Sequence, residues 1–231
     1  MSRHLPRLAA ALAFLGLVAP ADAGFISGNT AGSTSQLGNF TGSIAVSSSS
    51  STMATLTVTL TNTSPAANGG FLTAFVLNNP DNEITGITLT SAPANFGLIG
   101  TAPFTNGTLN GAPFGQFAFG ASTGGSFEGG GNPALGLAVG ASGTFVFNLT
   151  GTNLNNLTEA SFDNTLSSGT GDGMGDQFFV ARFRGFDIGG SDKVPGMTTG
   201  SAVPEPSSMV LMGIAGMIGL VARKRFQGRP A

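Results

Sequence analysis

Apolar and polar residues alternate along several short stretches in the middle of the chain. Leu56, Val58 and Leu60 alternate with the threonines from 55 to 61, and a period of two places successive side chains on opposite faces of a strand. Residues 71–77 are apolar almost throughout and predict a strand that is buried on both faces. No stretch between the two ends of the chain has the 3.6-residue apolar period of an amphipathic helix. The pattern therefore predicts an all-β fold.

Turn-forming residues separate these strands. Further apolar alternations occur at 87–89, 117–119, 135–139, 145–149 and 178–183, with Gly, Pro, Asn and Ser between them. Many short strands joined by such turns favour an antiparallel β-sandwich, jelly-roll-like or immunoglobulin-like. A parallel β-solenoid is the alternative, but no fixed-period repeat supports it.

Composition permits a core without disulfides or metals. Hydrophobic residues make up 41% of the 231, there is no Cys, Trp or Tyr, and 19 phenylalanines remain to supply large apolar surfaces. A domain of about 170–180 residues buries roughly two thirds of its unfolded surface. The 37 glycines are abundant, but the apolar content predicts a folded domain rather than a disordered one.

Charge is distributed unevenly along the chain. Residues 24–203 contain three basic side chains, Arg182, Arg184 and Lys193, against nine acidic ones. Because binding to phosphate groups needs clustered Lys and Arg, this balance disfavours a nucleic-acid partner and an anionic lipid surface.

The N-terminal segment has the three parts of a secretory signal peptide. Arg3 and Arg7 precede an apolar run at 8–18, and Ala21-Asp22-Ala23 forms an A-x-A cleavage site. We expect residues 1–23 to be removed, with Gly24 as the first residue of the mature chain. An anchor helix is the alternative, but the apolar run is short for a membrane span.

Near the other end, Pro204-Glu205-Pro206 leads into an uncharged apolar segment and then into Arg223-Lys224-Arg225. As a helix, residues 207–222 would be about 24 Å long, slightly less than the hydrocarbon thickness of a bilayer. The three basic residues predict that this end stays on the cytoplasmic side, with the preceding domain outside.

This order of parts resembles the PEP-CTERM family of sorting tails, in which a Pro-Glu-Pro motif, a short apolar helix and a basic cluster follow one another. The resemblance covers residues 204–231 only. It implies recognition by an exosortase, an integral membrane enzyme, with the chain held in the inner membrane by its C-terminal helix before any processing. It also implies a final location in the cell envelope or an exopolysaccharide matrix of bacteria.

Residues 181–195 are similar to the end of ectodomains that accompany such tails and have no assigned activity. We therefore expect an ectodomain at 24–195, a linker at 196–203 and the sorting tail at 204–231.

Few residues could perform catalysis. The single histidine, His4, lies within the predicted signal peptide, and there is no cysteine, which excludes the common Ser-His-Asp and Cys-His arrangements from the mature chain. Ser122 lies in a G-x-S-x-G match at 120–124, which we interpret as accidental because no base accompanies it. A glycosidase could use paired carboxylates, but the chain lacks the Trp and Tyr that stack on sugars. We expect no enzyme activity and no cofactor.

Calcium is the one metal with a candidate site. Asp172 and Asp176 flank a Gly-Met-Gly segment, and carboxylate and carbonyl oxygens suit calcium. The segment lacks the residues of an EF-hand, so we favour a solvated loop. Asp81 and Glu83 form a weaker candidate.

Two arginines share one face of a predicted strand. Arg182 and Arg184 are two residues apart, with Asp187, Asp192 and Lys193 following. We expect a local ion-pair network; a site for acidic sugars is the alternative.

The sequence thus favours a structural protein of the cell surface or its exopolysaccharide matrix. A polysaccharide-binding or adhesin module, with or without calcium, is the alternative, because such a surface leaves no short motif.

Overall fold

The computed structural model describes residues 23–169 and 174–201. Within them, short polar turns separate strands whose residues alternate between the inside and the outside. The strands are β1 (Ala23–Gly28), β2 (Phe40–Ser50), β3 (Met53–Asn62), β4 (Gly69–Leu77), β5 (Ile84–Ser91), β6 (Gly97–Ile99), β7 (Leu109–Asn110), β8 (Gln116–Phe117), β9 (Phe119–Ser122), β10 (Leu137–Ala138), β11 (Ser142–Gly151), β12 (Phe179–Phe186) and β13 (Ser191–Ser201). One α-helix, α1 (Glu159–Asp163), and four short 3-10 helices at Thr30–Gly32, Pro80–Asn82, Pro133–Leu135 and Leu154–Asn156 complete the described elements.

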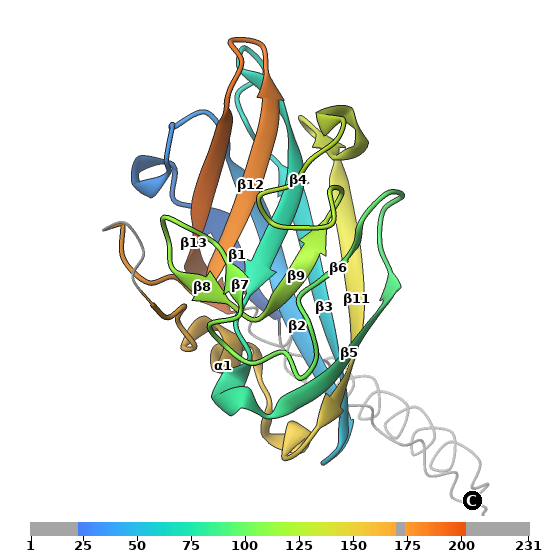
Figure 1. Cartoon of the computed structure of the whole chain (residues 1–231). Helices are drawn as coiled ribbons and strands as arrows, with labels where there is room; N and C mark the ends of the chain where they lie inside the picture. Colours follow the sequence, from blue (N-terminus) through green and yellow to red (C-terminus); the bar gives the residue numbers. More distant parts are fainter. Residues whose placement is uncertain (1–22, 170–173, 202–231) are drawn as a thin grey trace, which may run out of the picture.

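The strands form one large antiparallel sheet that folds over on itself. Its order is β5-β11-β3-β2-β1-β13-β12-β4-β9-β6, with β10 beside β4 and a separate β7-β8 pair. Strand β13 connects the two layers, because 191–195 pair with β12 and 196–201 pair with β1. The edge strands β5 and β6 lie near each other, so the sheet is nearly closed, like a barrel. Figure 1 shows β12, β4 and β9 in front of β2, β3 and β11.

Phenylalanines fill the space between the layers, as the composition predicts. Phe75 of β4 packs against Phe145, Phe147 and Phe179, with ring centroids 4.7, 6.3 and 5.6 Å away. These four rings are fully buried, and Phe162 of α1 belongs to the same core. Edge-to-face and stacked pairs of this kind add to the hydrophobic stabilisation.

A second, smaller core covers the outer side of β4. Ala74 and Val76 point away from the main core and contact the buried side chains of Phe114, Phe117 and Phe127. Strand β4 is therefore buried on both faces, as its apolar sequence predicts.

The predicted all-β, antiparallel class is confirmed. The strand order shows two layers of one continuous sheet; a jelly-roll-like or immunoglobulin-like sandwich is a finer prediction that this order does not establish. Two details differ from expectation: residues 135–139 form only the two-residue β10 after a 3-10 turn, and residues 196–201, predicted as linker, belong to β13.

The predicted membrane segment at 207–222 lies outside the described residues. Among residues 23–169 and 174–201, no helix is both long enough and apolar enough to span a bilayer.

Candidate functional site

The first and last described strands lie side by side. Gly24 is the register partner of Ser201, and Ile26 that of Thr198. Of the predicted cleavage residues, Ala23 and Gly24 therefore belong to β1, whereas Ala21 lies outside the described residues. Gly24, the predicted first residue of the mature chain, and Ser201, the last described residue, thus lie side by side in the sheet.

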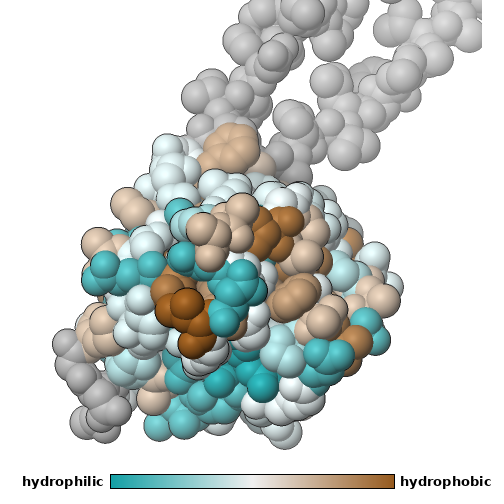
Figure 2. Space-filling model, turned by 90° about the horizontal axis from the view of Figure 1, so that it is seen from above, coloured by the Kyte–Doolittle hydropathy of each residue, from teal (hydrophilic) through white to brown (hydrophobic). Residues whose placement is uncertain are grey.

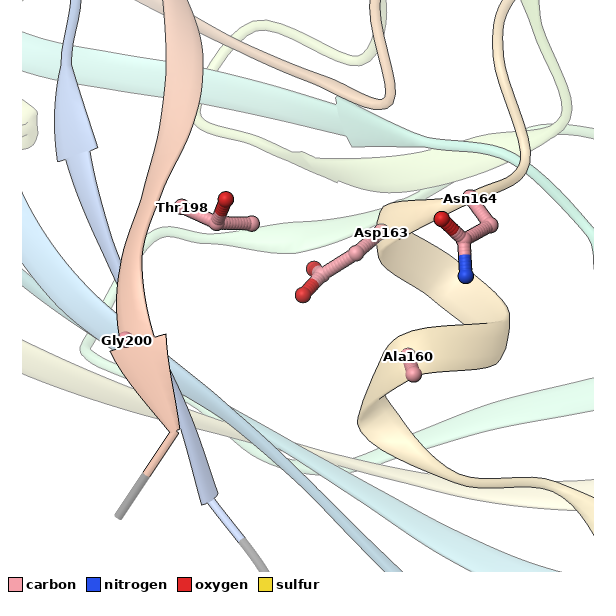
Figure 3. A pocket seen from close by; sticks show the side chains of 5 residues that line it. All are labelled: Ala160, Asp163, Asn164, Thr198 and Gly200. Atoms are coloured by element: carbon pink, nitrogen blue, oxygen red, sulfur yellow. The ribbon is translucent and has the colours of Figure 1, made fainter.

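A cavity of about 270 Å³ lies between α1 and the end of β13. Ala160, Asp163 and Asn164 line it from the helix side, and Thr198 and Gly200 from the strand (Figure 3). The Asp163 side chain extends from α1 toward β13, and its Oδ1 is buried without a hydrogen-bond partner. Burial, together with the charge of Glu159, raises the pKa of Asp163 to about 6.

The helix that carries Asp163 is fixed by its own sequence and by the core. Thr158 caps it: the Thr158 side chain accepts from the Ser161 N–H, while the Ser161 side chain accepts from the Thr158 N–H. Phe162, 1% exposed, anchors it in the main core. The apolar pattern does not predict this five-residue helix, because it is too short to show an apolar period; the Thr-x-x-Ser pattern before Phe162 is its signal in the sequence.

Asp192 is a buried carboxylate that accepts five hydrogen bonds. Its side chain is fully buried, and its carboxylate accepts hydrogen bonds from the backbone N–H groups of Ser35, Leu37 and Gly38 at 2.8 to 2.9 Å. The hydroxyls of Ser33 and Thr34 donate two more at 3.1 and 3.0 Å. Asp192 therefore fixes the loop between β1 and β2, and the predicted ion-pair network does not include it.

The three basic side chains, Arg182, Arg184 and Lys193, contact other groups of the same chain. Glu128 lies 2.5 Å from Lys193 and 3.6 Å from Arg182. Arg182 also donates to the Phe127 carbonyl, and Arg184 to the Gly130 carbonyl. Burial lowers the pKa of Arg182, a shift that the Glu128 charge opposes. Among the described residues, the ion pairs of Arg182 and Lys193 therefore use Glu128, which the sequence analysis did not include, and neither Asp187 nor Asp192 takes part. These contacts hold the glycine-rich loop at 123–132 against the outside of β12.

The outer face of β2, β3 and β11 is rich in hydroxyl groups and has no charged side chain. Thr59 lies between Ser43 and Thr144, and Thr61 between Thr41 and Ser142, in register across the three strands. Hydroxyls of neighbouring strands lie 3.2 Å apart for Thr59 and Thr144, and 2.7 Å apart for Thr61 and Ser142. The remaining outward residues are Ala45, Ser47, Met53, Thr55, Thr57, Val146, Asn148 and Thr150. We call this set of residues the hydroxyl face.

The end of the domain opposite α1 has scattered apolar side chains. Ile188, in the turn between β12 and β13, is 77% exposed. Seen from this end, brown residues form small separate groups among teal and white ones (Figure 2). No single broad apolar surface is visible on this view.

The comparison with protein families identifies the C-terminal tail. A family model described as the PEP-CTERM protein-sorting motif matches residues 202–225. The chain carries a PEP-CTERM sorting motif. The match contains Pro204-Glu205-Pro206 and reaches Arg223, Lys224 and Arg225, all of which lie outside the described residues.

The PEP-CTERM motif implies how the protein is handled. It implies an exported, envelope-associated protein that an exosortase, a membrane enzyme, sorts and processes. β13 ends at Ser201, and the family match begins at the next residue. The motif therefore follows directly after the last strand. No curated protein and no solved structure matches the chain significantly.

Ser122, in the G-x-S-x-G match upstream of the PEP-CTERM motif, lies at the end of β9. Its hydroxyl donates to the Ser126 carbonyl at 2.7 Å and accepts from the Gly124 N–H at 3.0 Å. The residue is 3% exposed. These contacts shape the turn after β9.

The calcium candidate is only partly described. Asp176 is exposed, and Asp172 lies outside the described residues. Among residues 23–169 and 174–201, no group of three or more acidic, His or Cys side chains could hold a metal ion. Of the weaker pair, Glu83 accepts a hydrogen bond from Asn153, and Asp81 has a left-handed φ of 50° in a turn.

We predict that millimolar calcium leaves the melting temperature of the protein unchanged. A ligand that binds only the native state would raise the melting temperature by mass action. Thermal unfolding with calcium and with a chelator measures this effect. A rise of several degrees that is absent in Asp172→Asn would contradict the prediction.

Proposed function

We propose that the protein is a non-catalytic component of the cell surface or of its exopolysaccharide matrix, and that the hydroxyl face contacts neutral polysaccharide. The hydroxyl face is the observation that carries this proposal. Neighbouring strands lie about 4.8 Å apart, and outward residues recur about every 6.8 Å along a strand. Apart from Ala45, Met53, Val146 and Asn148, the face thus offers regularly spaced hydroxyl groups that both donate and accept hydrogen bonds, as sugar hydroxyls do.

The charges favour a neutral partner over an acidic one. Arg182, Arg184 and Lys193 contact Glu128 or carbonyl groups of the glycine-rich loop, and none of them belongs to the hydroxyl face. Residues 24–203 have nine acidic side chains against these three, so an acidic polysaccharide would be repelled. A non-catalytic role is supported by the sequence, in which the only histidine is His4 and cysteine is absent.

A specific adhesin is the second candidate, and the same face favours it. The two differ in how binding depends on the sugar: a matrix component would bind many neutral polysaccharides weakly through hydroxyl and water-mediated contacts. An adhesin would select one glycan and saturate. A glycan array on the exported protein distinguishes them.

A negative charge placed at the centre of the hydroxyl face tests whether this face contacts polysaccharide. We predict that Thr57→Glu weakens binding to dextran on the order of tenfold or more, because a carboxylate must be desolvated against an uncharged partner. Affinity electrophoresis in gels that contain dextran measures the retardation of each variant. Thr105→Glu, an exposed threonine in the loop between β6 and β7, is the matched control and should bind like wild type.

Two outcomes would contradict this proposal. Equal retardation of Thr57→Glu and wild type would mean that the hydroxyl face is not the contact surface. If no neutral polysaccharide retards the wild type at all, the domain has no polysaccharide contact of the kind proposed.

A further inference from the structure

We propose that removal of the signal peptide gives Gly24 an N-terminal ammonium that forms an ion pair with Asp163 at the cavity between α1 and β13. The inference rests on the proposed export and on cleavage after Ala23. Hydrolysis of the Ala23–Gly24 amide consumes one water, whose oxygen goes to the Ala23 carbonyl carbon. The Gly24 nitrogen leaves as an amine and at neutral pH takes the proton that the new carboxylic acid releases.

The position of Gly24 carries this inference. A side-chain carbon built on Gly24 would lie 3.6 Å from Asp163 Oδ2 and 3.2 Å from Glu159 Cγ. Two atoms bonded to one Cα lie about 2.5 Å apart, so the Gly24 nitrogen is at most about 6 Å from Oδ2. An opposite charge within about 4–6 Å favours the ionised form of both groups.

The surroundings of Asp163 contain a negative charge and no described positive one. Glu159, four residues earlier on α1, faces it. Residues 23–28 of β1, 40–50 of β2 and 196–200 of β13, which pack against α1 or line the cavity, have no titratable side chain. With Oδ1 buried and unpartnered, Asp163 has room in the cavity for a cation but no cationic side chain on these elements. Cleavage at the predicted site would supply that cation within the chain.

The ion pair would add a contact between β1 and α1 at the end of the fold where β13 ends. Gly24 is paired with Ser201, the last described residue before the PEP-CTERM match. A contact from Gly24 to Asp163 would therefore hold β1 to α1 beside the end of β13. Only the cleaved chain has this contact, so β1 would be held to α1 more firmly after export than before.

The pKa of the N-terminal amine tests the inference. The exported protein is first analysed by intact mass: an N-terminus other than Gly24 contradicts the cleavage premise, separately from the ion pair. Trace labelling with acetic anhydride as a function of pH, read by peptide mass, then gives the pKa of the amine. We expect a value about one unit above the ordinary 7.7–8.0 of an α-amino group.

Matched variants assign the shift to Asp163. Asp163→Asn should lower the pKa of the amine relative to wild type, with Glu159 still nearby, whereas Asp187→Asn, an exposed aspartate in the turn between β12 and β13, should leave it unchanged. An ordinary pKa in wild-type protein that begins at Gly24 would overturn the inference. That measurement needs no variant, so it holds even if Asp163→Asn fails to fold.

Discussion

Replacing Asp192 with alanine is expected to lower the free energy of unfolding by about 3 kcal/mol or more. The carboxylate accepts five hydrogen bonds, three of them from backbone N–H groups of the loop between β1 and β2. Without it all five donors lose their partner, and those of the buried Ser33 and Gly38 have little access to water, where unsatisfied donors are costly. Urea denaturation, followed by circular dichroism, measures the change.

Two variants separate this effect from a general effect of losing a charge. Asp187→Ala removes an exposed aspartate five residues away and should change the free energy of unfolding by less than about 0.5 kcal/mol. Asp192→Asn keeps the shape but replaces one acceptor oxygen with a donor that faces other donors, so it should also be strongly destabilising. Equal stability of Asp192→Ala and Asp187→Ala would mean that the loop finds other partners.

Local patterns predicted the strands whose two faces differ in polarity. β3 has Leu56, Val58 and Leu60 on its buried face and threonines on its outer face, so a period of two is visible. β4 lies between two strands and under a second core, which its continuous apolar sequence indicates. These features depend on residues that are close in the sequence.

The strands that were missed depend on distant partners. In β2, Gly42 and a run of serines interrupt the alternation, yet β1 and β3 pair with it on both sides. Residues 197–200 of β13 are exposed and show no apolar alternation, so their strand structure comes from pairing with β1, about 170 residues earlier. A local sequence pattern cannot show pairing between strands so far apart in sequence, so 196–201 has the pattern of a linker.

The same distinction applies to the candidate sites. The donors that surround Asp192 are 154 to 159 residues away in sequence, so its burial was not predictable from its own neighbours. Glu128 is likewise 65 residues from Lys193. The PEP-CTERM motif, in contrast, is a contiguous segment, and the family match at 202–225 confirms the resemblance that the residues themselves suggest.

The largest functional effect is expected from the substitution Glu205→Ala in the PEP-CTERM motif. The uncharged segment at 209–222 would supply membrane affinity, and Arg223 to Arg225 would set its orientation, which leaves Pro204-Glu205-Pro206 for recognition. In a host with an exosortase, wild type should lose the segment that follows the motif, whereas Glu205→Ala should keep it. Membrane insertion should not change, because residue 205 precedes the apolar segment.

Intact mass of the surface-associated protein, compared between a host with an exosortase and one without, measures this effect. Ser207→Ala, directly after the Pro-Glu-Pro triplet, is the matched control and should be processed like wild type. Both substitutions lie beyond Ser201, where β13 ends, so we expect the same melting temperature for all three proteins. If wild type and Glu205→Ala keep residues 207–231 in both hosts, the tail acts as a plain membrane anchor and exosortase does not process it.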